Sequence, residues 1–141
     1  MTFWVVEPEV AGSIGPRTVM RQSSVGGWFV EKLNYEFQGW LGDQLLETTP
    51  CFIVTAKVAE SMTSSDLTGF SFDDVECTTS DLFKELHPER ALPAFRWLKI
   101  DADAGQADIG LTPDLMLVVS AKALGCLDGA INNAVVEPWQ P

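Results

Sequence analysis

The chain has 141 residues, of which 46% are hydrophobic and 21% charged, and this composition is typical of a folded domain rather than a disordered chain. Twenty acidic residues against nine lysines and arginines give a net charge of −11. Such a charge repels phosphate backbones and anionic lipid surfaces, so binding to nucleic acid or to a membrane is disfavoured. No apolar stretch approaches the roughly 18 residues of a membrane span, and the first residues lack the basic region of a targeting signal.

Along the chain, short apolar or alternating runs predict strands at residues 3–6, 34–37 and 95–100. The glycine-rich run at residues 25–30 gives no clear prediction. Residues 42–47 resemble a short helix that ends before Pro50, and Ser80 is a good N-cap for a helix that reaches Leu86. Residues 12–16 and 101–105 are typical of loops and turns. This mixture predicts an α+β fold: a single domain over residues 1–141, with one mixed sheet and short flanking helices.

The sequence contains a short internal similarity. Residues 52–57 and 117–122 are 65 positions apart, and three of their six residues are identical. In each case an apolar run is followed by a hydroxyl residue, Thr55 or Ser120, that can cap a helix through its side-chain oxygen. A turn and a second strand follow, at residues 70–76 and 134–137. We therefore expect two similar strand–helix–strand units, residues 51–76 and 115–139, whose strands are parallel neighbours within one sheet. Coincidence is the alternative, because this local pattern is common.

The three cysteines, Cys51, Cys77 and Cys126, are an odd number without CxxC spacing, which is not typical of a disulfide framework. Buried free thiols in a reducing compartment fit better, and this predicts a cytoplasmic protein.

Residues for catalysis or metal binding are scarce. The only histidine, His87, lies at the end of a predicted helix, and nothing in the sequence places a nucleophile beside it. The cysteines lack zinc spacing, and phosphate-binding loops are absent as motifs. Residues 101–112 depart from a calcium loop at the fifth, sixth and twelfth places. We therefore expect no catalytic residues, no metal and no cofactor.

Two other features point to a protein partner. Of the five tryptophans, Trp28 and Trp40 are flanked by glycines and are the least needed by a core. Residues 101–141 hold six acidic residues and one lysine, and Asp101, Asp103 and Asp108 lie in or near one predicted loop. These five residues are the candidate partner-binding residues, with the carboxylates steering a basic partner toward the protein.

The pattern of the two units resembles a known family. Cys51–Thr55 followed by a helix and by Leu67–Glu76, and again Leu117–Ser120 with the ending Val135–Trp139, is similar to immunity proteins of bacterial polymorphic-toxin systems. The resemblance is to their α+β group with paired strand–Ser/Thr–helix–Gly–strand segments, and it covers about residues 33–139. The second unit departs from the pattern by having Asn132-Asn133 where the first has Thr68-Gly69. The resemblance implies a cytoplasmic protein that binds and neutralises a cognate toxin domain, with no catalysis of its own.

Two other functions remain open. A small-molecule-binding or enzymatic domain could use scattered residues such as Trp97, Asp101 and Glu76. A general interaction module without any toxin is the third possibility.

Overall fold

The computed structural model describes residues 2–141, and within this range the chain forms twelve strands and three short helices. The predicted α+β class is therefore confirmed. The elements are β1 (Phe3–Glu7), β2 (Gly12–Ile14), β3 (Val19–Gln22), β4 (Trp28–Phe37), β5 (Leu45–Thr48), β6 (Cys51–Thr55), α1 (Ala56–Ser64), β7 (Phe70–Asp73), β8 (Val75–Thr79), α2 (Asp81–Leu86), β9 (Phe95–Ile100), β10 (Ile109–Leu111), β11 (Leu117–Ser120), α3 (Ala121–Cys126) and β12 (Val135–Trp139).

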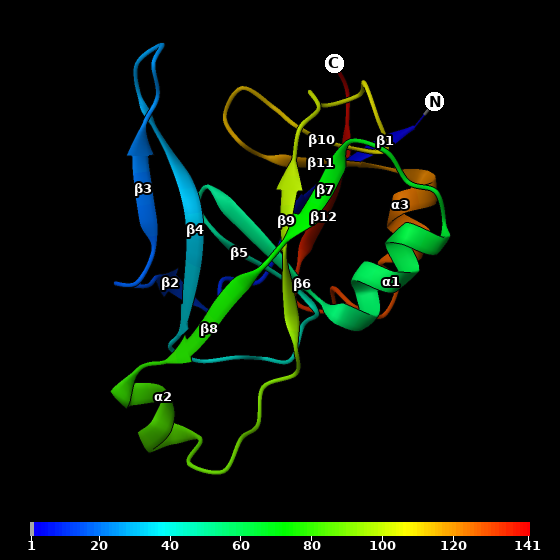
Figure 1. Ribbon diagram of the computed structural model, residues 1–141. Helices are drawn as coiled ribbons and strands as arrows, with labels where there is room; N and C mark the ends of the chain where they lie inside the picture. Colours follow the sequence, from blue (N-terminus) through cyan, green and yellow to red (C-terminus); the bar gives the residue numbers. More distant parts are fainter. Residues whose placement is uncertain (1) are drawn as a thin grey trace.

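The strands form three sheets rather than the one mixed sheet that we expected (Figure 1). Each sheet has four strands, and two of them have the orders β5-β6-β9-β7 and β10-β11-β1-β12. In the third sheet, the long strand β4 pairs with β2 and β3 in antiparallel fashion and with β8 in parallel.

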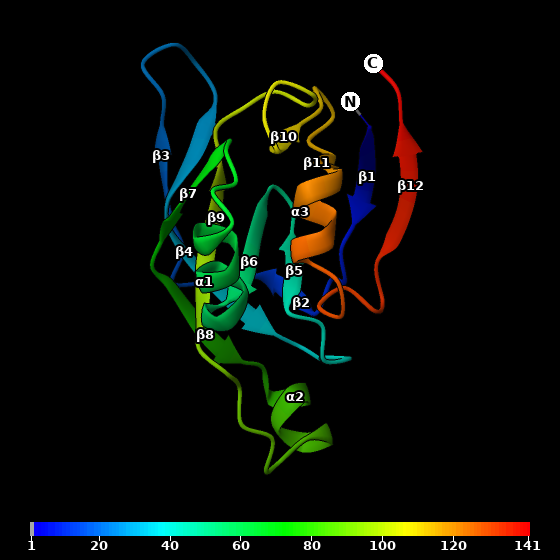
Figure 2. The same ribbon diagram turned by 90° about the vertical axis from the view of Figure 1, so that its right-hand side faces the viewer.

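The two predicted units have the same arrangement in the structure. β6 and β7 are both antiparallel to β9, which lies between them, and β11 and β12 are both antiparallel to β1, which lies between them. The strands of each unit are therefore parallel, but the expectation that they are direct neighbours in one sheet is wrong. A strand from outside the unit separates them, and each unit belongs to its own sheet. The helices α1 and α3 lie side by side (Figure 2).

Both predicted helix caps are present. The hydroxyl of Thr55 accepts a hydrogen bond from the backbone N–H of Val58 at 3.3 Å, and that of Ser120 accepts one from Ala123 at 3.1 Å. The structure adds a second bond to each cap, which the sequence did not indicate. Thr55 donates to the side chain of Gln44 at 2.9 Å, and Ser120 donates to that of Asp108 at 2.7 Å.

We expect Thr55→Ala and Ser120→Ala each to lower the free energy of unfolding by about 0.5–2 kcal/mol, because a helix loses its N-cap. Ser120→Ala should cost the more of the two, since it also removes a donor to a carboxylate, and hydrogen bonds to charged groups are the stronger ones. Urea denaturation of the three proteins measures this. Equal midpoints for both variants and the unaltered chain would contradict the capping role.

Three predicted elements are corrected by the structure. Residues 42–47 do not form a helix, because Leu45–Thr48 instead pair with β6 as strand β5. The predicted loop at residues 12–16 contains β2, which pairs with the end of β4. The strand predicted at residues 70–76 is interrupted at Asp74, and its two parts, β7 and β8, join different sheets. In each case pairing with a distant strand outweighs local preference, as is common for strands.

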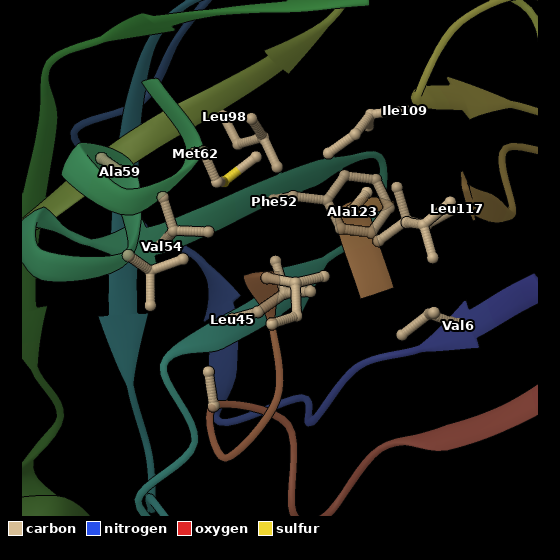
Figure 3. Packing of buried hydrophobic residues seen from close by; sticks show 14 residues of the cluster. Val6, Leu45, Phe52, Val54, Ala59, Met62, Leu98, Ile109, Leu117 and Ala123 are labelled. Atoms are coloured by element: carbon tan, nitrogen blue, oxygen red, sulfur yellow. The ribbon is translucent and has the colours of Figure 1, made fainter. Parts of the chain in front are cut away.

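Two apolar clusters fill the interior. The first lies between the sheet of β6 and β9 and the sheet of β1 and β11, and it includes Phe52, Leu98 and Leu117, covered by Met62 of α1 and Ala123 of α3 (Figure 3). The second cluster joins β4 to the opposite face of β6 and β9, and it contains several aromatic side chains: Tyr35, Phe37, Phe83, Phe95 and Trp97. Strand β6 therefore contributes side chains to both clusters, which explains why all five of its residues are buried.

None of the three helices in the described part of the chain has the length and apolar character needed to cross a membrane.

Candidate protein-binding surface

The hairpin of β3 and β4 extends beyond the body of the protein (Figure 1). Several of its apolar side chains are exposed to solvent. Val25 at its turn is 93% exposed, Trp28 is 66% exposed and Phe29 is 49% exposed. The turn uses Gly26 and Gly27, which both adopt the positive φ values that favour glycine. Contiguous exposed apolar side chains of this kind mark interaction surfaces in soluble proteins.

A β-bulge decides which way the hairpin presents Trp28. The pairing of β3 with β4 shifts between Val19↔Lys32 and Met20↔Val30, so that Glu31 is the extra residue on β4. Beyond a bulge the alternation of side chains shifts by one residue. Val30 consequently packs against the same cluster as Leu33. Trp28, two residues before Val30 in β4, lies on the same side of the strand as Val30.

Trp28 lines a hollow of about 360 Å³ between the hairpin and the sheet of β6 and β9. Its lining is mainly apolar and comes from four segments: Trp28–Val30, Pro50–Phe52, Trp97–Ile100, and Leu111 with Leu115. Lys99 lies 4.8 Å from the centre of the Trp97 ring, and its ammonium is 3.5 Å from the carboxylate of Asp73.

A second hollow, of about 720 Å³, adjoins the next part of β4, where β4 and β8 diverge. The parallel ladder between these strands begins at Leu33↔Val75, because the residues before Val75 turn away to pair with β9 as β7. Figure 1 shows the two strands separating. We call this place the fork. Its hollow is lined by four acidic and two basic residues together with two apolar ones: Glu31, Asp73, Asp74, Glu76, Arg17, Lys32, Leu33 and Val75.

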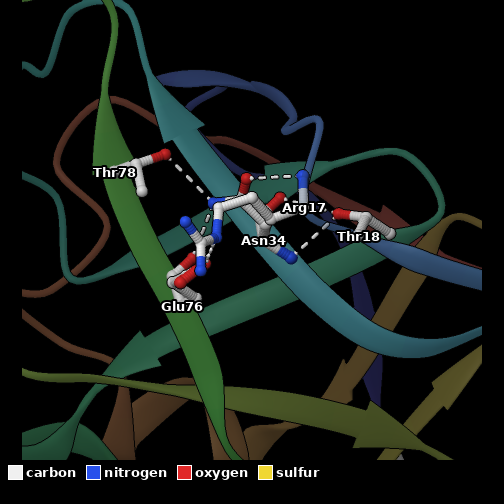
Figure 4. Close-up of polar contacts among 5 residues, drawn as sticks. All are labelled: Arg17, Thr18, Asn34, Glu76 and Thr78. Atoms are coloured by element: carbon white, nitrogen blue, oxygen red, sulfur yellow. Dashed lines mark hydrogen bonds and ion pairs between the residues drawn. The ribbon is translucent and has the colours of Figure 1, made fainter.

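The base of the fork is held by the side chain of Asn34, which is 1% exposed (Figure 4). Its amide donates to the backbone oxygen of Glu76 and to the hydroxyl of Thr78, both at 3.0 Å, and accepts from the backbone N–H of Arg17 at 3.2 Å. These bonds connect the start of the hairpin to β8. Gly15 is required here, because a Cβ atom would lie 2.0 Å from the Asn34 side-chain oxygen.

The two tryptophans predicted to bind a partner do not share a surface. Trp40 is half-buried, with its ring edge-on to Phe37 and Phe95 at 6.2 and 6.1 Å between ring centres. Its indole N–H donates to the backbone oxygen of Asp43 at 2.9 Å, and the guanidinium of Arg90 lies 4.4 Å from its ring centre. Trp40 therefore has packing partners within the chain, whereas Trp28 is free to contact another molecule.

The three predicted carboxylates also differ in their surroundings. Asp101 and Asp103 are exposed, and Asp101 directly follows Ile100, which lines the hollow beside Trp28. Asp108 is only partly exposed and accepts hydrogen bonds from Ser120 Oγ at 2.7 Å, Thr68 N at 3.0 Å and Thr68 Oγ1 at 3.1 Å. Its carboxylate connects the cap of α3 to the turn after α1, which is a structural role.

The carboxylate of Asp43 also makes a structural bridge, to the turn after α3. It accepts from the backbone N–H and the side-chain amide of Asn133, both at 2.8 Å. The sequence does not indicate either bridge, because their partners are 90 and 40 residues away.

The hydrogen bonds to Asp108 should make the stability of the fold depend on pH. Burial raises the pKa of this carboxyl, but hydrogen bonds from Ser120 and Thr68 outweigh it and hold the pKa below the ordinary value. A lowered pKa in the folded state stabilises the fold above the unfolded-state value, near 3.9, and this stability is lost as the pH falls through the folded-state value. Asp108→Asn should therefore reduce the unfolding free energy at pH 7 by about 0.5–1.5 kcal/mol, because solvent screens this partly exposed carboxylate, and the reduction should be smaller at pH 3.

Urea denaturation at the two pH values measures this difference. Asp128→Asn is the matched control, since Asp128 is exposed on the turn after α3. An equal loss of stability for Asp108→Asn at pH 7 and pH 3 would contradict the role of its charge.

The residues considered for the enzymatic alternative are not gathered into one site. Trp97 lines the hollow beside Trp28, whereas Glu76 lines the fork and pairs with Arg17 at 2.6 Å. His87 is the C-cap of α2 and lies against Phe83. Burial raises the pKa of the Cys51 and Cys77 thiols to about 11, which disfavours the nucleophilic thiolate. No group of three potential metal-binding side chains lies together anywhere in residues 2–141.

The hairpin itself is the part of the surface that sequence reasoning missed. Its signal was the short stretch of residues 23–27, which contains Gly26 and Gly27 and lies between two runs with β-branched or aromatic residues, a pattern typical of a hairpin with a longer loop. Trp28 was selected for its glycine neighbours, and the bulge and the hollow beside it were not foreseeable.

In the comparisons with known proteins, no protein-family model and no curated protein sequence matches this chain.

Proposed function

We propose that this chain is an immunity protein, which binds a cognate toxin domain in the cytoplasm and blocks it without catalysis. The observation that carries the proposal is the exposed apolar hairpin, with Trp28 beside a hollow lined by apolar residues. The resemblance of residues 33–139 to immunity proteins supports it. An exposed tryptophan next to a hollow is the kind of residue that dominates protein–protein binding energy.

The charge of the chain supports a basic partner. A net charge of −11 attracts a basic toxin domain and speeds its encounter with the protein. The enzymatic alternative has less support, because the candidate residues are dispersed and the Cys51 and Cys77 thiols have raised pKa values.

The test is co-expression with the toxin domain that this proposal expects to be encoded beside the gene of this chain. We expect rescue of growth and a stoichiometric complex that survives size-exclusion chromatography. Rescue that requires one molecule of this chain per toxin molecule is the signature of blocking by binding. Rescue by far fewer molecules, with no complex, would favour an enzymatic function. No rescue and no complex would reject the proposal.

Exposed carboxylates near the hairpin should affect how fast the complex forms. The double variant Asp101→Asn/Asp103→Asn should slow association by a factor of roughly two to five at low salt and leave dissociation almost unchanged. The effect should shrink at high salt, because the screening length falls. Biosensor measurements at two salt concentrations test this. We leave Asp108 unchanged in this variant, since its substitution would alter stability as well as charge. An association rate indifferent to both salt and the substitutions would leave these charges without a role in binding.

A further inference from the structure

Part of strand β4 has an edge without a partner. Residues 28–32 pair with β3 on one edge, and β2 continues along the same edge further down the strand. On the opposite edge β8 pairs only with residues 33–37. Within the described residues, no backbone hydrogen bond beyond the β3–β4 ladder involves residues 28–32. In a strand, alternate residues direct their N–H and C=O groups to each edge, so this segment offers unpaired donors and acceptors.

No strand lies beside residues 28–32 on this edge, because the residues that precede β8 pair with β9 as β7 instead of continuing along β4. The hollow at the fork lies at the lower end of the free edge, next to residues 31–33, and the hollow beside Trp28 lies next to residues 28–30. Both hollows therefore adjoin the same segment of β4. An added strand would find space along the whole segment, with mainly apolar surface next to residues 28–30 and mainly charged surface at the fork.

We propose that the partner toxin binds by adding an extended segment as a strand to the free edge of β4 at residues 28–32. This inference rests on the proposed function. Main-chain hydrogen bonds to β4 supply the pairing, as in other cases of β-strand addition. Alternate side chains of the added segment enter the hollow beside Trp28, and its basic side chains lie at the fork.

The unpaired carboxylate of Asp74 at the fork and the net charge of −11 favour a basic occupant. Four carboxylates against two cationic side chains line the fork. Three of these carboxylates already have cationic partners, since Glu76 pairs with Arg17, Glu31 with Arg21 and Asp73 with Lys99. The side chain of Asp74 is exposed and has no hydrogen-bond or ion-pair partner among the described residues. A second copy of this chain is a poor occupant, because each copy has a net charge of −11 and the two repel one another.

Hydrogen exchange followed by NMR tests the pairing directly, with the whole chain free and in complex with the toxin domain encoded beside its gene. We expect alternate amides of residues 28–32 to exchange at least about tenfold more slowly in the complex. The outer amides of β3, residues 19–22, are the internal control and should not change. Contact through side chains alone would cover Trp28 without protecting these amides.

A matched pair of variants tests the charge of the added segment. Asp74→Lys and Asp128→Lys make the same change in net charge, one at the fork and one on the turn after α3. We expect Asp74→Lys to raise the Kd of the complex at least fivefold more than Asp128→Lys does. The reason is that only Asp74 would lose a contact with a basic side chain of the added segment. Both residues are exposed, so both variants should fold.

The outcomes separate this inference from the proposed function. A complex with no slowed amides in residues 28–32, or with protection on β3 instead, overturns strand addition and leaves the immunity function standing. Equal effects of the two lysine variants overturn the basic character of the segment. The absence of any complex rejects the proposed function and this inference together.

Discussion

Replacing Phe52 with alanine should lower the free energy of unfolding by about 3–5 kcal/mol. Phe52 lies in β6, is 2% exposed, and belongs to the cluster between the sheet of β6 and β9 and the sheet of β1 and β11 (Figure 3). Truncation removes its buried ring and leaves a cavity, because closely packed neighbours such as Leu98 and Leu117 relax only in part. A loss of this size is a large fraction of the stability of an ordinary domain.

Phe29→Ala is the matched control, since it removes the same ring from a position that is 49% exposed on the hairpin. Its cost should be below about 1 kcal/mol. Guanidinium denaturation of both variants measures the difference, with the slope of the transition checked for two-state behaviour. Similar losses for the two variants would mean that the cluster around Phe52 is not the main source of stability.

Trp28→Ala should weaken the complex with the toxin domain by at least about 2 kcal/mol, or roughly 30-fold in Kd, and should hardly change stability. The indole is mostly in solvent in the free protein, so its removal creates no cavity in the core. In the complex, the same ring would be buried between the hairpin and the partner. The expected change lies mainly in the dissociation rate, because short-range contacts act after encounter.

Leu86→Ala is the control for this prediction. Leu86 is also exposed, but it lies on α2, at the opposite end of the molecule from the turn of the hairpin (Figure 1). Calorimetric titration of the toxin domain into each variant gives the two Kd values. If Leu86→Ala weakens binding and Trp28→Ala does not, the partner binds at the α2 end and the hairpin is not the binding surface.

The sequence alone determined the elements whose stability is local. The helix after Ser80 and the helices of both units begin where a hydroxyl side chain can bond to a backbone N–H three residues later, a contact that needs no distant partner. The sequence similarity between residues 52–57 and 117–122 predicted the same local structure in both segments, and both form a strand followed by a capped helix. Alternation along residues 95–100 was sufficient for β9.

Features that depend on a distant partner were decided only in three dimensions. β5 is a strand because β6 lies beside it, and Asp108 has an internal role because Thr68 and Ser120 converge on it. The two tryptophans predicted to bind a partner also differ in their surroundings, because Trp28 is in solvent and Trp40 packs against Phe95. The free edge of β4 exists only because β7 pairs with β9 rather than continuing beside β4. Capping and alternation are energies between near neighbours and can be seen in the sequence, whereas strand pairing and packing are energies between residues tens of positions apart, which only the folded chain brings together.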